Sequence, residues 1–376
     1  MNQPCPHQDD QYHPSAVVGP STPPVQQLHH QLPPGSWPPS TPKEGKAWKW
    51  LLGGVAVLAV IGVTVAVTVA VVGEGKGSDS PPAASISETD SAGSDIASAN
   101  DTGAITIITE EPTCAPLAPI MTALADAQKN GWTERDPSIP AHAWPTEVRR
   151  QYESVGVAMR KAADQLVPLA RATPHRVIRE LYEQSIAYLR AYADSIPTYS
   201  PRDNSLIRAA SSAANAITNI CSAIDYGAAA ARAPLVKPLP APSQLPPVGD
   251  LENPQRFLTR PNPVCREWAD AIAGFQRDAA AWGNTSPNIP VGQWSAEQRA
   301  VNDEVIPVMK RFANQAIALG KRSDNTVLQD FAALTAVYRL AYVEAVPTYM
   351  PDDKYLINAS VLASGVVEMA CEAVEG

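Results

Sequence analysis

The same sequence pattern occurs twice in this chain, 150 residues apart, and this duplication constrains the fold more than any other feature. When residues 132–224 are aligned with 282–374 without a gap, 27 of the 93 positions are identical. The first cysteine of each copy also corresponds, Cys114 with Cys265, after a difference of one residue in length. We therefore expect two copies of one domain, over residues 113–231 and 263–376.

Each copy has the periodicity of helices. From Val327 to Ala345, apolar residues recur at steps of three and four, which predicts one buried helical face. Thr173, followed by proline, is a candidate N-cap, and Ser295 with Gln298 forms a candidate capping box. The predicted fold class is all-α, with two tandem four-helix bundles. The expected helices lie near 114–130, 146–172, 174–195 and 203–225, and near 265–281, 295–320, 324–345 and 353–374.

The cysteines test this arrangement. Cys5 lies near the N-terminus, and the other four allow three pairings: Cys114, Cys221, Cys265 and Cys371. In an up-down-up-down bundle the start of the first helix and the end of the fourth lie at the same end. We therefore predict the disulfides Cys114–Cys221 and Cys265–Cys371, one for each copy. A metal site is the alternative, but the sequence has neither a C-x-x-C motif nor a matching pair of histidines.

An apolar run without any charged residue precedes the two copies, at 51–72. As a helix these 22 residues would be about 33 Å long, enough to cross a hydrocarbon core of roughly 30 Å. A cleaved signal peptide is the alternative, but its apolar core should have about 7–15 residues and lie near the N-terminus. We expect an uncleaved transmembrane helix over residues 48–72, which makes the cytoplasmic membrane one partner of the protein.

The residues beside this run predict its orientation. Lys43, Lys46 and Lys49 come just before it, whereas one lysine among acidic residues follows it. Because positive charge stays on the cytoplasmic side, the N-terminus should be cytoplasmic and the two copies extracytoplasmic. The predicted localisation is the cytoplasmic membrane, with a single pass.

The first 47 residues are rich in proline and poor in apolar residues, so we expect a disordered cytoplasmic tail over residues 1–47. The tetrapeptide PSTP occurs twice, and its P-x-x-P spacing could bind the aromatic groove of a cytoplasmic partner. Thr22 and Thr41 each precede a proline and are candidate phosphorylation sites. Chance spacing in an unstructured tail is the alternative.

Two further segments have the composition of connectors. Residues 73–112 are rich in Ser, Asp, Ala and Gly, which predicts a flexible extracytoplasmic stalk. Residues 232–262 are rich in proline, which predicts a stiffer linker between the two copies.

The sequence offers little for catalysis. His142 and His175 are the only histidines after the apolar run, and the second copy has Gly292 and Asn325 in their places, so a duplicated histidine-based enzyme is excluded. Walker, G-x-S-x-G and dinucleotide motifs are absent from the sequence. We expect no catalytic residue, no metal and no cofactor. The formal net charge of −9, without clustered Lys or Arg, also argues against a nucleic-acid partner.

The heptapeptide core of "IPTYSPRD" returns as "VPTYMPDD", with Tyr199 and Asp203 repeated as Tyr349 and Asp353. It is either a duplicated binding site or a corner between the third and fourth helices, and we favour the corner. The first proline would end one helix, and the aspartate would start the next, either as N-cap or two residues after a proline at the first position. The tyrosine rings should cover the bundle end, with each hydroxyl bound to a backbone or Asp partner.

Tryptophans recur as well, Trp144 and Trp294, in the long loop between the first two helices of each copy. They are expected to anchor that loop, with a ligand platform as the alternative.

The order of segments resembles that of uncharacterised proline-rich single-pass membrane proteins of mycobacteria and related actinobacteria. The resemblance rests on a Pro-rich tail, a Val- and Ala-rich span, a Ser/Asp-rich stalk and an Ala-rich helical region with paired cysteines. It implies a location in the cell envelope and no assigned reaction. The sequence thus predicts a non-catalytic scaffold or sensor that binds another envelope protein or ligand. An enzyme acting on cell-wall or lipid substrates is the alternative.

Overall fold

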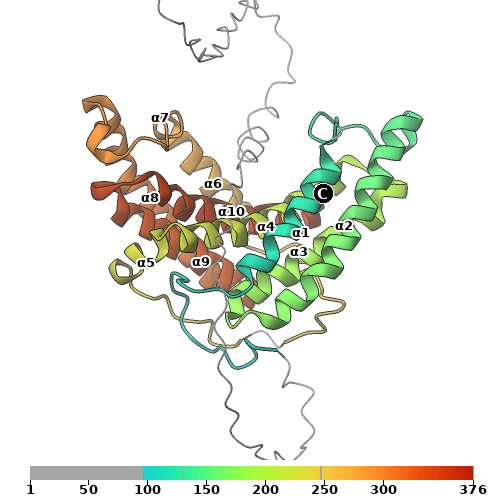
Figure 1. Ribbon diagram of the computed structural model, residues 1–376, viewed down its shortest axis with the longest axis horizontal. Helices are drawn as coiled ribbons and strands as arrows, with labels where there is room; N and C mark the ends of the chain where they lie inside the picture. Colours follow the sequence, from blue (N-terminus) through green and yellow to red (C-terminus); the bar gives the residue numbers. More distant parts are fainter. Residues whose placement is uncertain (1–95, 130, 246–247, 376) are drawn as a thin grey trace, which may run out of the picture. The chain divides into compact units, whose positions relative to one another are not determined.

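Helices make up almost all regular structure in the described part of the chain (Figure 1). The computed structural model describes residues 96–129, 131–245 and 248–375. The all-α class is confirmed, and every expected helix is present within a few residues of its predicted bounds. The first repeat has α1 (Cys114–Gln128), α2 (Thr146–Ala172), α3 (Arg176–Ser195) and α4 (Asn204–Asp225), followed by the short α5 (Ala228–Arg232). The second has α6 (Cys265–Asp278), a short α7 (Ala280–Gly283), α8 (Ala296–Arg322), α9 (Thr326–Ala345) and α10 (Lys354–Glu375).

The two predicted N-caps have different outcomes. Ser295 caps α8, since its hydroxyl accepts the backbone N–H of Gln298 at 3.1 Å. The prediction for Thr173 is wrong, because α3 begins at Arg176 and His175 is its N-cap residue. The Thr173 hydroxyl instead donates to Glu111 Oε2 at 2.6 Å, in the segment that precedes α1. A long-range acceptor thus replaced the local capping contact.

Both predicted disulfides are present. Cys114 is bonded to Cys221, and Cys265 to Cys371, with Cα–Cα distances of 5.4 and 5.5 Å. Each joins the start of the first long helix of a repeat to the end of the fourth. Disulfides of this kind persist in oxidising compartments, which indicates that the helical unit is extracytoplasmic.

The two repeats do not stand apart as separate bundles, because α4 and α10 form an extensive contact with each other (Figure 1). They run antiparallel: Ser205, at the start of α4, donates to Glu372 at the end of α10 (3.0 Å), and Tyr226, after α4, stacks on Tyr355 near the start of α10. A Cβ at Gly365 would lie 3.2 Å from Ser212 Oγ, so a glycine suits this close approach. Both repeats therefore share one continuous core.

Residues 96–112 correct the predicted extent of the stalk. Ile105, Ile107 and Ile108 are each about 5 % exposed and belong to the core. The backbone N–H of Ile108 donates to the hydroxyl of Tyr338, in the second repeat (3.2 Å). The Thr113 hydroxyl lies 2.8 Å from that of Tyr182, in the first. We call residues 96–113 the N-terminal strap, and any flexible stalk has to end before it.

The linker is also packed against the helices. Leu251 and Leu258 are buried, and Leu239 pairs with Ile105 of the strap in an isolated antiparallel bridge. The ring of Phe257 lies edge-on to Tyr188 of α3 and Phe331 of α9. Its described residues therefore contribute to the core that joins the repeats, rather than acting as a spacer alone.

Several predictions lie outside the described residues: the tail at 1–47, the transmembrane helix at 48–72, the first part of the stalk, and Thr22 and Thr41. Within the described residues, one segment, Pro351–Glu375, is long and apolar enough to cross a membrane. It contains α10, whose apolar window is 56 % buried inside the helical unit and whose Cys371 is disulfide-bonded. These contacts identify it as a core helix.

Candidate functional site

The repeated PTY motif lies at the corner between the third and fourth helices of each repeat. Tyr199 and Tyr349 are each 1 % exposed. Their hydroxyls donate to the carbonyl oxygens of Pro137 (2.8 Å) and Pro287 (2.6 Å), in the loop between the first two helices. Burial raises the pKa of both tyrosines, so the hydroxyls stay protonated and able to donate.

The aspartates of the motif stabilise the turn from a position two residues after the proline, which is the second of the two expected arrangements. Asp203 is the third residue of a 3-10 turn, Pro201–Asp203, and its Oδ2 accepts the backbone N–H of Ser200 at 2.7 Å. Asp353 does the same for Met350 at 2.8 Å. Neither side chain caps the following helix. Asp353 also receives a bidentate ion pair from Arg232 of the linker (3.0 and 2.9 Å), so the second corner is held more firmly.

The tryptophans attach the long loop to the same corner. Trp144 Nε1 donates to Ile139 O, and Trp294 Nε1 to Ile289 O, both at 2.8 Å. The Trp144 ring lies 5.2 Å from that of Tyr199, and the Trp294 ring 5.5 Å from that of Tyr349. The paired aromatics therefore pack in or against the core instead of gathering on an exposed surface.

We expect Tyr199→Phe to lower the free energy of unfolding by about 0.5–1.5 kcal/mol, because it removes one hydrogen bond and leaves Pro137 O without its donor. Urea unfolding of the purified protein measures this. Tyr226→Phe is the control, since Tyr226 is 57 % exposed. Unchanged stability together with lost partner binding would favour a binding role for the motif.

A cluster of buried charges lies between the repeats, and it was not predicted from the sequence. Arg176 of α3 makes a bidentate ion pair with Asp330 of α9, with Nε–Oδ2 at 2.9 Å and Nη2–Oδ1 at 3.1 Å. Glu180 lies one turn along α3, with its Oε1 4.0 Å from Arg176 Nε. The strap covers this inter-repeat cluster, since Asp101 O accepts from Arg176 Nη1 at 2.7 Å. In the alignment of the two repeats, Glu180 and Asp330 occupy the same position. This repeated acidic residue was the sequence signal that could have revealed the cluster.

Glu180 differs from its counterpart in hydrogen bonding. It is fully buried, and neither carboxyl oxygen has a hydrogen-bond partner in the described residues. Burial first, and the nearby Asp330 second, hold its pKa well above the usual range. Arg176 thus faces three acidic side chains, Asp330, Glu180 and Asp101, and burial disfavours the ionised form of Glu180.

Glu180→Gln should reduce the pH dependence of stability. An acid whose pKa is raised by folding binds its proton more tightly in the folded state, so stability falls as pH rises above the unfolded value near 4.5. Glu368, whose pKa burial raises to about 7, acts in the same direction, so part of the slope should remain. Thermal unfolding at pH 5.5 and 7.5 tests this, with the exposed Glu147 as control in Glu147→Gln. An unchanged slope would show that Glu180 is ionised in the folded state.

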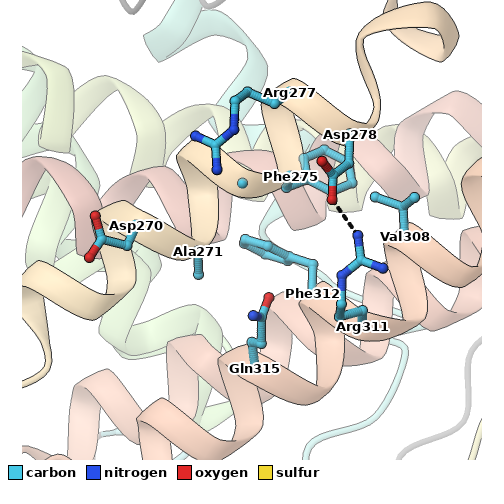
Figure 2. Close-up of a pocket in the computed structure, with 10 residues that line it drawn as sticks. Asp270, Ala271, Phe275, Arg277, Asp278, Val308, Arg311, Phe312 and Gln315 are labelled. Carbon is cyan, nitrogen blue, oxygen red and sulfur yellow. Dashed lines mark hydrogen bonds and ion pairs between the residues drawn. The ribbon is translucent and has the colours of Figure 1, made fainter.

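A groove between α6 and α8 of the second repeat is a candidate binding site on the described surface (Figure 2). It consists of two adjoining hollows of about 220 and 350 Å³. Figure 2 shows Phe275 and Phe312 between the two helices, with charged side chains around them. The residues lining the two hollows are Glu267, Asp270, Ala271, Gly274, Phe275, Arg277, Asp278, Val308, Arg311, Phe312, Gln315, Ala318, Leu319 and Arg322.

Ion pairs connect the two walls of the groove. Arg311 binds Asp278 at 2.5 Å, and Arg322 binds Glu267 at 2.6 Å, both exposed. Asp270 forms no ion pair with any residue that the structure describes. The arrangement provides an apolar floor between polar margins, which suits a bound segment or small molecule. Among the described residues, no cluster of three His, Cys, Asp or Glu side chains is arranged to hold a metal ion.

The floor of the groove differs in character between the two repeats. Phe275 and Phe312 correspond to Leu124 and Ala162 in the first repeat, and the buried Arg339 beneath them corresponds to Leu189. This site was not predicted from the sequence, because its residues are not shared by the two copies. A comparison of apolar positions at which one copy gains a charge would have found Arg339.

Comparison with known proteins adds a family. Residues 96–375 match a family model described as "Mycobacterial ESX-1 associated protein". An uncharacterised protein of Mycolicibacterium smegmatis (strain MKD8) is 51 % identical over 362 residues, which cover 94 % of this chain and 95 % of the relative. No solved structure matches the chain. The matched region begins at the strap, so the strap is part of the family's common unit.

Proposed function

Because this chain belongs to the mycobacterial ESX-1 associated protein family, we propose that it is a non-catalytic binding component that works beside the ESX-1 system at the cytoplasmic membrane. Residues 48–72 would anchor it by a single pass, with the Pro-rich tail in the cytoplasm and the helical unit outside. The helical unit would bind another envelope protein, and the tail would recruit or report to a cytoplasmic partner.

The groove between α6 and α8 is the observation that supports binding. One repeat has a plain apolar core at this place, whereas the other has aromatic rings, charged margins and a buried cation. The stability of the fold alone does not require this difference between the two repeats. Two of the three acidic side chains that line the groove are held in ion pairs, so it offers no pair of free carboxylates for acid–base catalysis.

Site-specific photo-cross-linking in mycobacterial membranes tests the proposal. A photoreactive residue at Gln315, which lines both hollows, should form a cross-link to an ESX-1 component. The matched control is Gln165, the exposed counterpart in the first repeat. Equal cross-linking from both positions, or none to an ESX-1 component, would count against the proposed function.

A further inference from the structure

Arg339 is a buried cation without an acidic partner. It is 1 % exposed, and its Nε donates to Ser360 Oγ at 3.1 Å. Its Nη1 has no hydrogen-bond partner, and no ion pair to it is present among the described residues. The two comparably buried arginines differ in this respect, since Arg176 binds Asp330 and Arg179 binds Glu183.

The surroundings of Arg339 only partly compensate its charge. Its guanidinium lies 4.2 Å from the ring centre of Phe275 and 4.1 Å from that of Phe312, so two ring faces provide cation–π contacts. Burial lowers its pKa to about 9, and the side chain therefore remains charged at neutral pH. An unpaired buried charge is unfavourable unless a counter-charge reaches it.

The fold itself does not require this cation. The first repeat has Leu189 at the corresponding position, and Ala210 in place of Ser360. Both residues are buried in an apolar core. One turn before Arg339, the hydroxyl of Thr335 is also buried without a partner. Two donors on the same stretch of α9 thus lack acceptors, which points to a missing anionic or polar occupant.

The two phenylalanines place Arg339 directly beneath the groove. Phe275 and Phe312 line the groove and also flank the guanidinium. Phe275 is only partly buried, and a ligand that enters from the groove would have to displace its ring to reach the guanidinium. We propose that Arg339 anchors a carboxylate carried by a peptide segment of a partner protein, a proposal that rests on the groove's proposed role in binding.

The chemistry of the groove selects this ligand. A monovalent carboxylate loses less hydration than a phosphate dianion on entering a site walled by two aromatic rings. Ala271 and Val308 provide apolar contacts for the group that carries it. Asp270 and Arg277, two turns apart on α6, have opposite charges and make no ion pair with any of the described residues. A peptide can complement both, whereas a simple acyl chain cannot.

Thermal unfolding of the full-length protein in detergent tests the carboxylate site, with hexanoate, hexanamide and inorganic phosphate as probes. Hexanoate should give a saturable rise in Tm of about 2–5 °C, as expected for a ligand well above its Kd. Hexanamide and phosphate should give less than a third of this rise. Arg339→Leu should abolish the response, while Arg339→Lys should retain a weaker one. Arg160→Gln, which removes an exposed ion pair in the first repeat, should respond like the wild type.

Three results would overturn the carboxylate site: no response of the wild type, an equal response to hexanamide or phosphate, or an unchanged response in Arg339→Leu. The peptide source has a separate test. The cross-link from Gln315 should be lost in Arg339→Leu and recovered in part in Arg339→Lys. If hexanoate binds but the cross-link persists in Arg339→Leu, the peptide assignment fails while the proposed function stands.

Discussion

Asp330→Ala is expected to lower the free energy of unfolding by about 3–5 kcal/mol, because it leaves Arg176 buried without its bidentate acceptor. The ion pair connects α3 of one repeat to α9 of the other, so its loss should loosen the joint between them. Chemical denaturation of the full-length protein in detergent measures the change. Asp278→Ala, which breaks the exposed ion pair with Arg311, should cost less than about 1 kcal/mol.

Glu180 leads to a second expected result for the same ion pair. Once Asp330 is removed, Glu180 and Asp101 are the remaining acidic side chains near Arg176, each with a carboxyl oxygen at 4.0 Å, and Glu180 should lose its proton and replace part of the ion pair. Asp330→Ala combined with Glu180→Gln should therefore cost more than the sum of the two single changes. Additive effects, or an Asp330→Ala cost no larger than that of Asp278→Ala, would contradict this account of the inter-repeat cluster.

Replacement of Cys265 and Cys371 by alanine is expected to lower the free energy of unfolding by about 2–5 kcal/mol. The bond closes a loop with a sequence separation of 106, and it attaches α10, which packs against both repeats. Reduction of the wild type should reproduce the loss, as measured by denaturation with and without dithiothreitol.

The first-repeat disulfide is a matched comparison. Cys114–Cys221 closes a loop of nearly the same separation, 107, so the loss of chain entropy should be almost equal. A larger cost for the second bond would then reflect the contacts of α10 in the folded state. A cost below about 1 kcal/mol for both would show that packing, not cross-linking, closes each repeat.

The sequence was sufficient to predict the features of the fold that are local or that occur in both repeats. Apolar periodicity predicted the long helices, and the position of a cysteine at each end of each repeat predicted the disulfides. The corner motif was also located, because Pro197 and Pro201 interrupt the helical pattern. These features depend on neighbours along the chain or on bundle topology.

Contacts between the repeats could not be predicted in the same way. The small residues of α4 and α10 suited any buried helix, and nothing in them specified each other as partners. Ile105 and Ile107 alternate with polar residues as a strand would, but their composition resembled a stalk and concealed a packed segment. Arg339 was missed because a single charge in an apolar helix has no periodic signal.

The N-terminal strap has a consequence for the order of assembly. Residues 96–113 are synthesised before either repeat, yet Ile108 donates to Tyr338, 230 positions later, and the strap covers an ion pair completed by Asp330. The strap can contact the first repeat once α3 is made, but its contacts with the second repeat have to wait until almost the whole chain is available. Such distant contacts slow folding and favour late, all-or-none completion. A chain that ends early would lack a finished core and would hold the strap by its first-repeat contacts alone.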